Sequence, residues 1–444
     1  MNLTKSIGKK FNAAVMNERI ARIEHASPQE PAGRLLIIVE NLPVPFDRRV
    51  WMEATTLKRA GYQVSLISPT GKGCESLYEE IDGIRIYRHQ LPPERSSPLG
   101  YIREYASALW SEWRLAHKVR KECGFEVIHA CNPPDLIFLV ALWFKALYGT
   151  QFIFDHHDLS PELYESKFNR RGLFYQVLRL AERLTYLSAD AVITPNESYR
   201  EIAMLRGNKR PEQVRVVRSA PDLAWFKRVP ANPIYRRGRR YLIGYLGVMA
   251  EFDGIDHLIK AARELVLNRG RRDVQFCLIG SGPMLESLKT LADDLKVTDY
   301  VEFTGRIPDS EVIERLSSCD VCVGPDPLNP LNDKSTMNKI LEYMALERAI
   351  VQYDLLEGRR SAADASLYAE PNNIEDFATK IEILLSKPDE RSQMGRLGLQ
   401  RMVESLEWKH QIPKLLKTYA DILGRVSEHR SNCQPSRSTG KFQQ

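Results

Sequence analysis

Short apolar runs alternate with longer amphipathic stretches along most of the chain, from Arg34 to about Val426. A short apolar run bounded by turn residues is typical of a buried strand, whereas apolar residues three and four positions apart are typical of a helix. Regular alternation of the two predicts parallel sheets. The runs expected as strands are Leu35–Val39, Gln63–Ser68, Ile84–Tyr87, Val127–Ala130, Phe152–Asp155, Ala191–Thr194, Val214–Val217, Tyr241–Leu246, Val274–Ile279, Val301–Phe303, Val321–Val323, Ile350–Gln352 and Ser366–Ala369.

The alternation is interrupted once, which divides the chain into two similar halves. Residues 223–240 carry six Lys or Arg and no acid, which is typical of a linker. We therefore predict an α/β fold with two Rossmann-like parallel-sheet domains that face a central cleft. The expected units are an N-terminal extension (1–33), a first domain (34–222), a basic linker (223–240), a second domain (241–405), a helix that crosses back to the first domain (406–426) and a disordered tail (427–444).

The most informative segment is 324–346, where a predicted strand leads into a loop rich in Pro and Asn and then into a helix. We expect this helix to begin near Ser335. The free N–H groups of its first turn would then face the loop, an arrangement that favours a phosphate-bearing ligand. Asn338 and Glu342 are four residues apart and share a face other than the apolar stripe. Glu342 can therefore point into a crevice.

Composition narrows the class of protein. A chain of 444 residues is longer than one hydrophobic core usually supports. The net charge of +6 is spread along the chain, so it does not call for nucleic acid as a partner. Seven cysteines form no disulfide framework and no signal-peptide core precedes them, so we expect a reducing cytoplasm. The pair Cys319 and Cys322 has no second pair to complete a zinc site, and we expect both to be structural.

Three stretches bear on membrane contact. The longest apolar run, Leu136 to Phe144, is far shorter than the ~20 residues that span a bilayer. In the N-terminal extension, Leu3, Ile7 and Phe11 share a helical face, which fits either a surface-seeking basic helix or a loosely docked one. The aromatic and basic stretch 101–121 fits either an acceptor-facing or membrane-facing helix or ordinary packing.

Several motifs occur in the order typical of one enzyme group. They are Gly244-Tyr-Leu-Gly247 with Gly254-Ile-Asp256, Leu278-Ile-Gly-Ser-Gly-Pro283, Phe303-Thr-Gly-Arg-Ile307, and Asp320-Val-Cys-Val-Gly-Pro325 before Leu341-Glu-Tyr-Met-Ala345. With them, residues 34–426 resemble the GT-B glycosyltransferases, and within these the family 4 retaining enzymes. Three first-half motifs resemble a branch that acts in bacterial surface polysaccharide assembly, namely Asn41-Leu-Pro-Val-Pro-Phe-Asp-Arg-Arg49, His129-Ala-Cys-Asn-Pro-Pro-Asp135 and Asp155-His-His-Asp158.

The resemblance implies that a nucleotide-diphosphate sugar binds mainly to the second half. Glu342 matches the carboxylate that holds the ribose hydroxyls in this family, and an ionised carboxylate can accept hydrogen bonds from both hydroxyls of a cis-diol. The alternative is a solvated glutamate on a helix surface. The other expected donor-side residues are Gly247, Gly280, Gly282, Arg306, Ser335, Thr336, Asn338 and Lys339.

Two departures from the family pattern concern the donor site. The family usually carries a second glutamate eight residues before the first, which contacts the donor sugar, and this chain has Lys334 there. Its usual Arg and Lys, which clamp the diphosphate, are replaced by Val248 and Asp253. A departing diphosphate needs cations or N–H dipoles. We therefore expect the helix start at Ser335 and Thr336 to stabilise it, aided by Lys334, Lys339 or Arg306. The alternative for Lys334 is a solvated lysine.

The first half supplies the remaining candidates. His156, His157 and Asp158 follow a predicted strand, where crevice residues lie in open α/β sheets, so a histidine there either bonds the sugar and moves a proton or pairs locally with an aspartate. The family's His-x-His register reads His129-Ala-Cys131. Arg48 and Arg49 open a predicted helix and either meet an acceptor phosphate or pair locally. The acceptor-side candidates are Arg48, Arg49, His129, Cys131 and Asn132.

The sequence thus predicts a cytoplasmic retaining transferase that moves a sugar from a nucleotide-diphosphate donor to a glycan, carried by polyprenyl diphosphate or another lipid at the inner membrane face. No Asp-x-Asp occurs, and we expect neither a metal nor a further cofactor. A dinucleotide-dependent oxidoreductase is disfavoured because the first βα turn lacks Gly-x-Gly-x-x-Gly. A sugar-nucleotide epimerase and a non-catalytic nucleotide-sugar-binding protein remain as alternatives.

Overall fold

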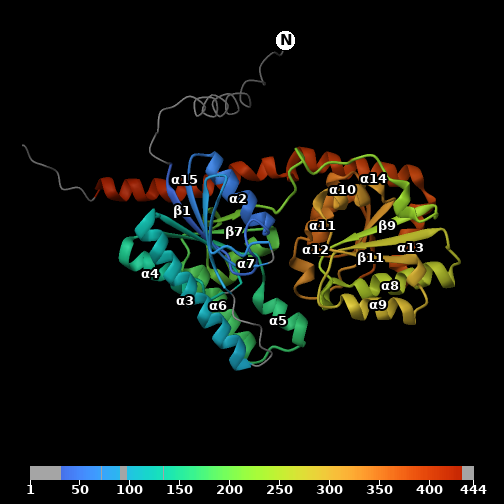
Figure 1. Ribbon diagram of the computed structural model, residues 1–444, viewed down its shortest axis with the longest axis horizontal. Helices are drawn as coiled ribbons and strands as arrows, with labels where there is room; N and C mark the ends of the chain where they lie inside the picture. The colour runs from blue at the N-terminus through green and yellow to red at the C-terminus, as the bar shows by residue number, and fades with distance from the viewer. Residues whose placement is uncertain (1–31, 72, 91–97, 134, 433–444) are drawn as a thin grey trace, which may run out of the picture.

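Two mainly parallel sheets, each with helices on both faces, form the described part of the chain (Figure 1). The computed structural model describes residues 32–71, 73–90, 98–133 and 135–432, so the predicted N-terminal extension lies almost entirely outside the described residues. The predicted α/β fold with two Rossmann-like domains is confirmed.

The first domain contains an eight-stranded sheet in the order β3-β4-β2-β1-β5-β6-β7-β8. All the expected strands are present, and one further strand was missed. This strand, β3, runs antiparallel to β4 at the edge of the sheet, and its sequence Tyr-Glu-Glu-Ile is too polar to show as an apolar run. The strands are β1 (Arg34–Ile38), β2 (Gln63–Pro69), β3 (Tyr78–Ile81), β4 (Ile84–His89), β5 (Val127–Cys131), β6 (Gln151–Asp155), β7 (Ala191–Thr194) and β8 (Val214–Val216).

Helices cover the two faces of this sheet unequally. One face packs against α3, α4, α6 and α7, and the other against α2 and the C-terminal helix α15 (Figure 1). The helix α2 begins at Arg48 because the side chain of Asp47 accepts a hydrogen bond from the Val50 N–H and so caps the first turn. The helices are α2 (Arg48–Arg59), α3 (Pro98–Glu122), α4 (Phe138–Tyr148), α5 (Ser160–Phe168), α6 (Leu173–Ser188) and α7 (Glu197–Gly207).

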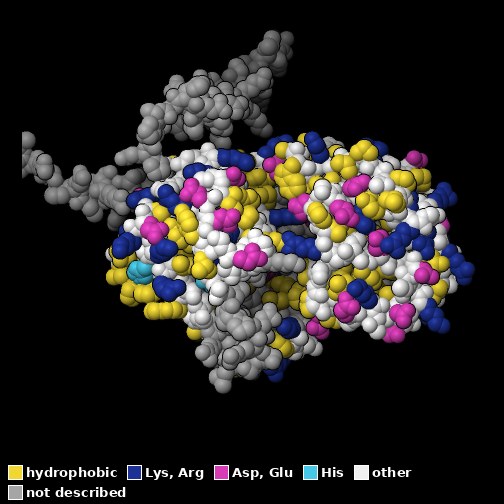
Figure 2. All heavy atoms as spheres, viewed as in Figure 1, with side chains coloured by type: hydrophobic (Ala, Val, Ile, Leu, Met, Phe, Trp, Pro, Cys, Tyr) yellow, Lys and Arg dark blue, Asp and Glu magenta, His cyan; other side chains and the backbone are white. Residues whose placement is uncertain are grey.

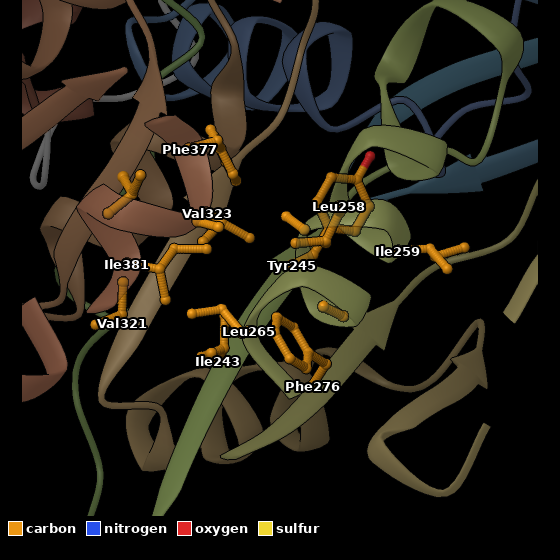
Figure 3. Close-up of a cluster of buried hydrophobic side chains, with 14 of the residues drawn as sticks. Ile243, Tyr245, Leu258, Ile259, Leu265, Phe276, Val321, Val323, Phe377 and Ile381 are labelled. Atoms are coloured by element: carbon orange, nitrogen blue, oxygen red, sulfur yellow. The ribbon is translucent and has the colours of Figure 1, made fainter. Parts of the chain in front are cut away.

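The second domain contains a six-stranded parallel sheet in the order β11-β10-β9-β12-β13-β14. Figure 3 shows the apolar cluster on one of its faces, where Val321 and Val323 of the sheet lie near Ile381 of α13. The strands are β9 (Tyr241–Leu246), β10 (Val274–Ile279), β11 (Val301–Gly305), β12 (Val321–Gly324), β13 (Ala349–Tyr353) and β14 (Ser366–Ala369), and the helices are α8 (Ile255–Arg263), α9 (Leu285–Asp294), α10 (Asp309–Ser318), α11 (Asn338–Ala345), α12 (Leu356–Ala362), α13 (Ile374–Ser386) and α14 (Pro388–Arg401).

The helix α15 (Trp408–Asn432) runs from the second domain back over the first (Figure 1). Its residue Trp408 donates a hydrogen bond from Nε1 to Thr56 Oγ1 of α2 at 3.0 Å. Farther along, Tyr419 packs in the core of the first domain and its hydroxyl lies 2.5 Å from His129 Nδ1. The helix continues six residues beyond Val426, so the predicted disordered tail cannot begin at residue 427. Residues 433–444 lie outside the described part.

Candidate active site

The carboxylate of Glu342 faces the first domain across the boundary between the two halves. Its Oε1 lies 3.2 Å from Nη1 of Arg48, the first residue of α2, and Arg48 also forms an ion pair with Asp309 of α10. Burial raises the pKa of Glu342, and Arg48 opposes this shift only in part. Neither Asp309 nor the pairing of Arg48 was predicted, because both depend on how the domains pack together.

A cavity of about 550 Å³ reaches Glu342 from between the domains. Arg48 and Asn338 stand at its rim beside Glu342. Most of the remaining wall comes from α2, from residues 219–226 and from Trp408 at the start of α15, and Pro45, Asp82 and Asp309 complete it. The aromatic part of the lining consists of Trp51, Trp225, Phe226 and Trp408.

The helix that carries Glu342 begins three residues later than predicted, at Asn338. A short 3₁₀ turn precedes it, and Ser335 is extended, with its hydroxyl donating to Leu331 O at 2.9 Å. Ser335 and Thr336 therefore do not form the N-terminus of α11. They contact the first domain instead, where Ser335 Oγ lies 3.2 Å from Tyr199 OH and Thr336 Oγ1 accepts from Asn196 Nδ2 at 3.0 Å.

Lys334 lies in the same contact between domains. Its backbone oxygen accepts a hydrogen bond from Asn196 Nδ2 at 2.8 Å, and its Nζ lies 3.6 Å from Glu162 Oε1 of α5. A third of its side chain is exposed. Lys334 is thus paired with an acid of the first domain yet remains partly open to solvent.

A second lysine, Lys339, is buried beside the loop that carries Gly247. Its Nζ binds Asp326 Oδ1 at 2.7 Å and lies above the ring of Tyr245. Burial alone would lower the pKa of Lys339, but Asp326, Tyr245 and Asp253 outweigh it and raise this pKa, so the lysine is charged. Burial also raises the pKa of Asp253 to about 6, with Lys339 opposing and Asp326 reinforcing the shift.

The three predicted donor-side glycines bring two loops of the second domain together. A Cβ at Gly280, whose φ is +136°, would lie 1.8 Å from Gly247 O, and one at Gly282 would lie 2.5 Å from Met249 O. No larger residue fits there without moving the backbone. Arg306, on the neighbouring loop, reaches across to the first domain, where its guanidinium lies 3.7 Å from the centre of the Phe46 ring.

Arg49, unlike its neighbour Arg48, is buried in the first domain. It donates two hydrogen bonds to Asp155, from Nε at 2.9 Å and from Nη2 at 2.7 Å, and its Nη2 lies 3.2 Å from Glu53. Its Nη1 donates to Val217 O at 2.8 Å. Burial raises the pKa of Asp155, but Arg49 and other partners outweigh it and hold this pKa well below its usual range. Arg49 therefore joins the end of β6 to the end of β8.

The two adjacent histidines after β6 have opposite environments. His156 is enclosed by aromatic rings and its Nδ1 lies 2.7 Å from Tyr186 OH, and burial lowers its pKa to about 3. His157 Nε2 lies 2.6 Å from Asp155 Oδ2. Burial would lower the pKa of His157, but Asp155 outweighs it and raises this pKa well above the usual value. At neutral pH His156 is therefore neutral. His157 is held between Asp155 and Arg49, whose Nε lies 3.1 Å from His157 Nε2.

Asn132 holds the turn that carries these residues. Its Oδ1 accepts from the backbone N–H of His157 at 2.7 Å and of Asp158 at 3.3 Å, while its Nδ2 donates to Asp158 O at 2.6 Å. Burial raises the pKa of Asp158, although His157 opposes the shift. Asn132 thus joins the end of β5 to the end of β6.

Among the described residues, one cluster has the ligand types of a metal site, namely His129, Cys131 and Asp155, whose ligand atoms lie within 4.8 Å of one another. Arg49 already provides a cation to Asp155 there, and His129 Nδ1 is engaged by Tyr419. The cluster is therefore a poor fit for a further cation. Cys319 and Cys322 are buried and free, which agrees with a structural role.

Comparison with known proteins defines the class. Residues 47–220 match the model "Glycosyl transferase 4-like domain" and residues 240–387 match "Glycosyl transferases group 1". Sucrose-phosphate synthase from Thermosynechococcus elongatus has a similar structure, with a TM-score of 0.73 and 17% identity over 88% of this chain and 100% of that one. The molecule is a GT-B glycosyltransferase.

Two curated relatives extend the comparison. The chain is 23% identical to "2-deoxystreptamine glucosyltransferase" of Streptomyces kanamyceticus over 77% of this chain and 89% of that protein. It is 26% identical to "GDP-mannose-dependent alpha-(1-6)-phosphatidylinositol monomannoside mannosyltransferase" of Mycolicibacterium smegmatis over 50% of this chain and 56% of that protein. The chain belongs to the group 1, family 4-like glycosyltransferases, retaining enzymes that use a nucleotide-diphosphate sugar as donor.

Proposed function

We propose that this enzyme transfers a hexosyl or N-acetylhexosaminyl unit to a lipid-linked glycan in cell-surface polysaccharide biosynthesis, at the inner face of the membrane. The observation that carries the donor side of this proposal is Glu342, a partly buried carboxylate that faces the cavity between the domains. A ribose diol can replace Arg48 as its hydrogen-bonding partner.

The binding of a donor in this way has a consequence for Arg48. An exposed ion pair contributes little, about 0–1 kcal/mol, so exchanging the Arg48 contact for two hydroxyl hydrogen bonds costs little. Arg48 keeps Asp309 as a partner after the exchange. The contact between Arg48 and Glu342 therefore allows the donor to enter. Arg48 then lies between the donor and the rest of the first domain.

The diphosphate requires a positive environment that the usual family clamp does not provide here. Lys339 and the N–H groups at the start of α11 offer one source, and Lys334 offers a second. In the transfer, the bond between the anomeric carbon and the diphosphate oxygen breaks, and the acceptor hydroxyl oxygen bonds to that carbon. The acceptor proton leaves with the nucleoside diphosphate.

The acceptor assignment is supported by the Mycolicibacterium smegmatis relative, whose name specifies a phosphatidylinositol monomannoside as acceptor. His157 is the stronger of the two histidine candidates for contact with the transferred sugar. It is 16% exposed in its side chain, whereas His156 is enclosed.

The test is a screen of nucleotide-diphosphate sugars for thermal stabilisation, followed by product analysis of the hits with and without lipid-diphosphate sugars. The proposal expects a glycosylated lipid and free nucleoside diphosphate that form only when acceptor is present. Conversion of the donor to an isomer without acceptor would instead identify an epimerase. Binding without turnover on any acceptor tested would identify a non-catalytic binding protein.

A further inference from the structure

The helix α4 lies on the surface of the first domain, yet it is apolar except for Lys145, which pairs with Asp190. One side packs on the sheet through residues such as Phe138, Val140 and Phe144. The opposite side exposes Leu139, Trp143 and Leu147, at 50%, 45% and 56%. A surface helix normally presents polar residues to water. None of the residues that the structure describes covers this face of α4.

The helix α6, which contacts α4, continues the apolar surface. Its exposed leucine and valine residues recur every three or four positions, so they form one stripe along the helix. Arg183 is the one exposed charge on α6. Figure 2 shows hydrophobic side chains gathered along the lower left margin of the molecule, where Figure 1 shows α4. The stripe consists of Leu173, Val177, Leu180, Leu184 and Leu187.

Aromatic residues join α3 to this surface. The rings of Trp110 and Trp113 of α3 stack with their centres 5.0 Å apart. The ring of Trp113 packs edge to face against that of Trp143 of α4, with the centres 5.9 Å apart. Trp110 is 61% exposed. Tryptophan is enriched where protein crosses from water into the headgroup region of a bilayer, because its ring is apolar and its N–H is polar.

The charges around this surface have one dominant sign. Among the described side chains from α3 to α6, one exposed residue is acidic, Glu122, and seven are basic. Two copies paired about a two-fold axis would bring this basic rim against itself, which is unfavourable, whereas anionic lipid headgroups complement it. The exposed basic residues are Arg114, Lys118, Lys121, Lys167, Arg170, Arg171 and Arg183.

We propose that the exposed face of α4 and α6, with the Trp cluster and its basic rim, docks the enzyme on the surface of an anionic lipid bilayer. None of the described helices has the length and apolarity to span a membrane, so the contact would be interfacial. The inference locates the membrane contact within the proposed function. The surface is built from described residues of the first domain, and none of them lines the cavity at Glu342.

The experiment is co-sedimentation of the full chain with vesicles of phosphatidylcholine, with and without about 30% phosphatidylglycerol, an anionic fraction high enough for the surface field to act. Leu180→Gln/Leu184→Gln replaces two apolar side chains of the α6 stripe that are 56% and 40% exposed. The matched control, Ile234→Gln/Leu267→Gln, removes residues 69% and 42% exposed in the linker and the second domain. We expect the first variant to lower the partition coefficient at least about tenfold, and the control to bind like the parent.

A charge variant tests the other half of the inference. Arg170→Gln/Arg183→Gln should weaken binding to anionic vesicles about fivefold per charge and should leave the weaker binding to neutral vesicles unchanged. Unchanged sedimentation of Leu180→Gln/Leu184→Gln would overturn the inference, because binding would then reside elsewhere. A parent that is dimeric by light scattering, becomes monomeric in this variant and binds no vesicles would identify a second copy as the occupant.

Donor titration of the same variants separates the two claims. None of the substituted residues lines the cavity at Glu342. Loss of vesicle binding with unchanged donor affinity supports the docking surface whatever the acceptor proves to be. Failure of the proposed function would instead appear as absent transfer by a protein that still binds vesicles.

Discussion

Substitution of Arg49 by methionine should destabilise the first domain far more than the same change at Arg48, the residue before it. Arg49 is 9% exposed and holds Asp155 with two hydrogen bonds, whereas the side chain of Arg48 is 46% exposed. Methionine keeps most of the length of the side chain but removes the charge and every donor.

The size of the effect follows from burial. Arg49→Met takes from the fully buried carboxylate of Asp155 its guanidinium partner and leaves it only the imidazoles of His157 and His129, and it removes the bond to Val217 O. Breaking a buried ion pair by removing one partner costs about 3–5 kcal/mol. Losing the exposed Arg48 pairs costs about 0–1 kcal/mol. For a domain of this size, about 2–4 °C per kcal/mol gives a fall in Tm of roughly 6–20 °C for Arg49→Met.

The assay is thermal unfolding at pH 7.5, followed by near-ultraviolet circular dichroism, with Arg48→Met as the matched control. A second variant, Arg49→Met/Asp155→Asn, removes the stranded charge and should recover part of the lost Tm. A fall in Tm for Arg49→Met no larger than that for Arg48→Met would refute the reasoning. Absence of any recovery in the double variant would show that lost packing, not the unpaired charge, sets the cost.

Two further predictions concern the donor's diphosphate. Burial raises the pKa of Asp253 to about 6, so this residue gains a proton and loses its negative charge as the pH falls from 7.5 to 5.5. Binding of the anionic donor, measured by calorimetry, should therefore tighten over that range. Asp253→Asn should bind the donor about threefold or more tightly at pH 7.5 and lose this pH dependence. Equal pH profiles for the two proteins would contradict this. Lys334→Ala should lower kcat at least about tenfold with a smaller change in KM, because the cation is expected to act on the leaving group. The control is Lys296→Ala, which replaces an exposed lysine elsewhere in the second domain. A change confined to KM would contradict a role of Lys334 in leaving-group departure.

Much of the fold could be predicted from the sequence because its core strands are apolar runs. Val321–Val323 or Ile350–Gln352 can be recognised without a partner, since such runs are buried on both faces of a parallel sheet. The strand Tyr78–Ile81 could not be recognised from the sequence, because it is a polar edge strand. Only its pairing with the neighbouring strand identifies it as part of the sheet. Local pattern also predicted Glu342 as the cleft carboxylate, from its spacing on α11.

The contacts between the domains could not be predicted in this way. The segment before α11 reads as a helix start, yet Ser335 is extended and docks with Thr336 on the first domain. The ion pair of Arg48 with Glu342 joins residues 294 positions apart. Periodicity likewise could not show that the apolar run in α4 would be half exposed, because an apolar residue in a helix predicts burial only if a partner exists.

The most direct test of the account is the affinity of a nucleotide-diphosphate sugar for the parent and for Glu342→Gln, measured by calorimetry with Glu404→Gln, an exposed glutamate near the end of the second domain, as control. A carboxylate that holds the ribose diol loses charge-assisted hydrogen bonds on this change, each worth about 1.5–3 kcal/mol. We expect Glu342→Gln to weaken donor binding at least about tenfold and Glu404→Gln to match the parent. Equal donor affinity for the parent and Glu342→Gln would contradict it.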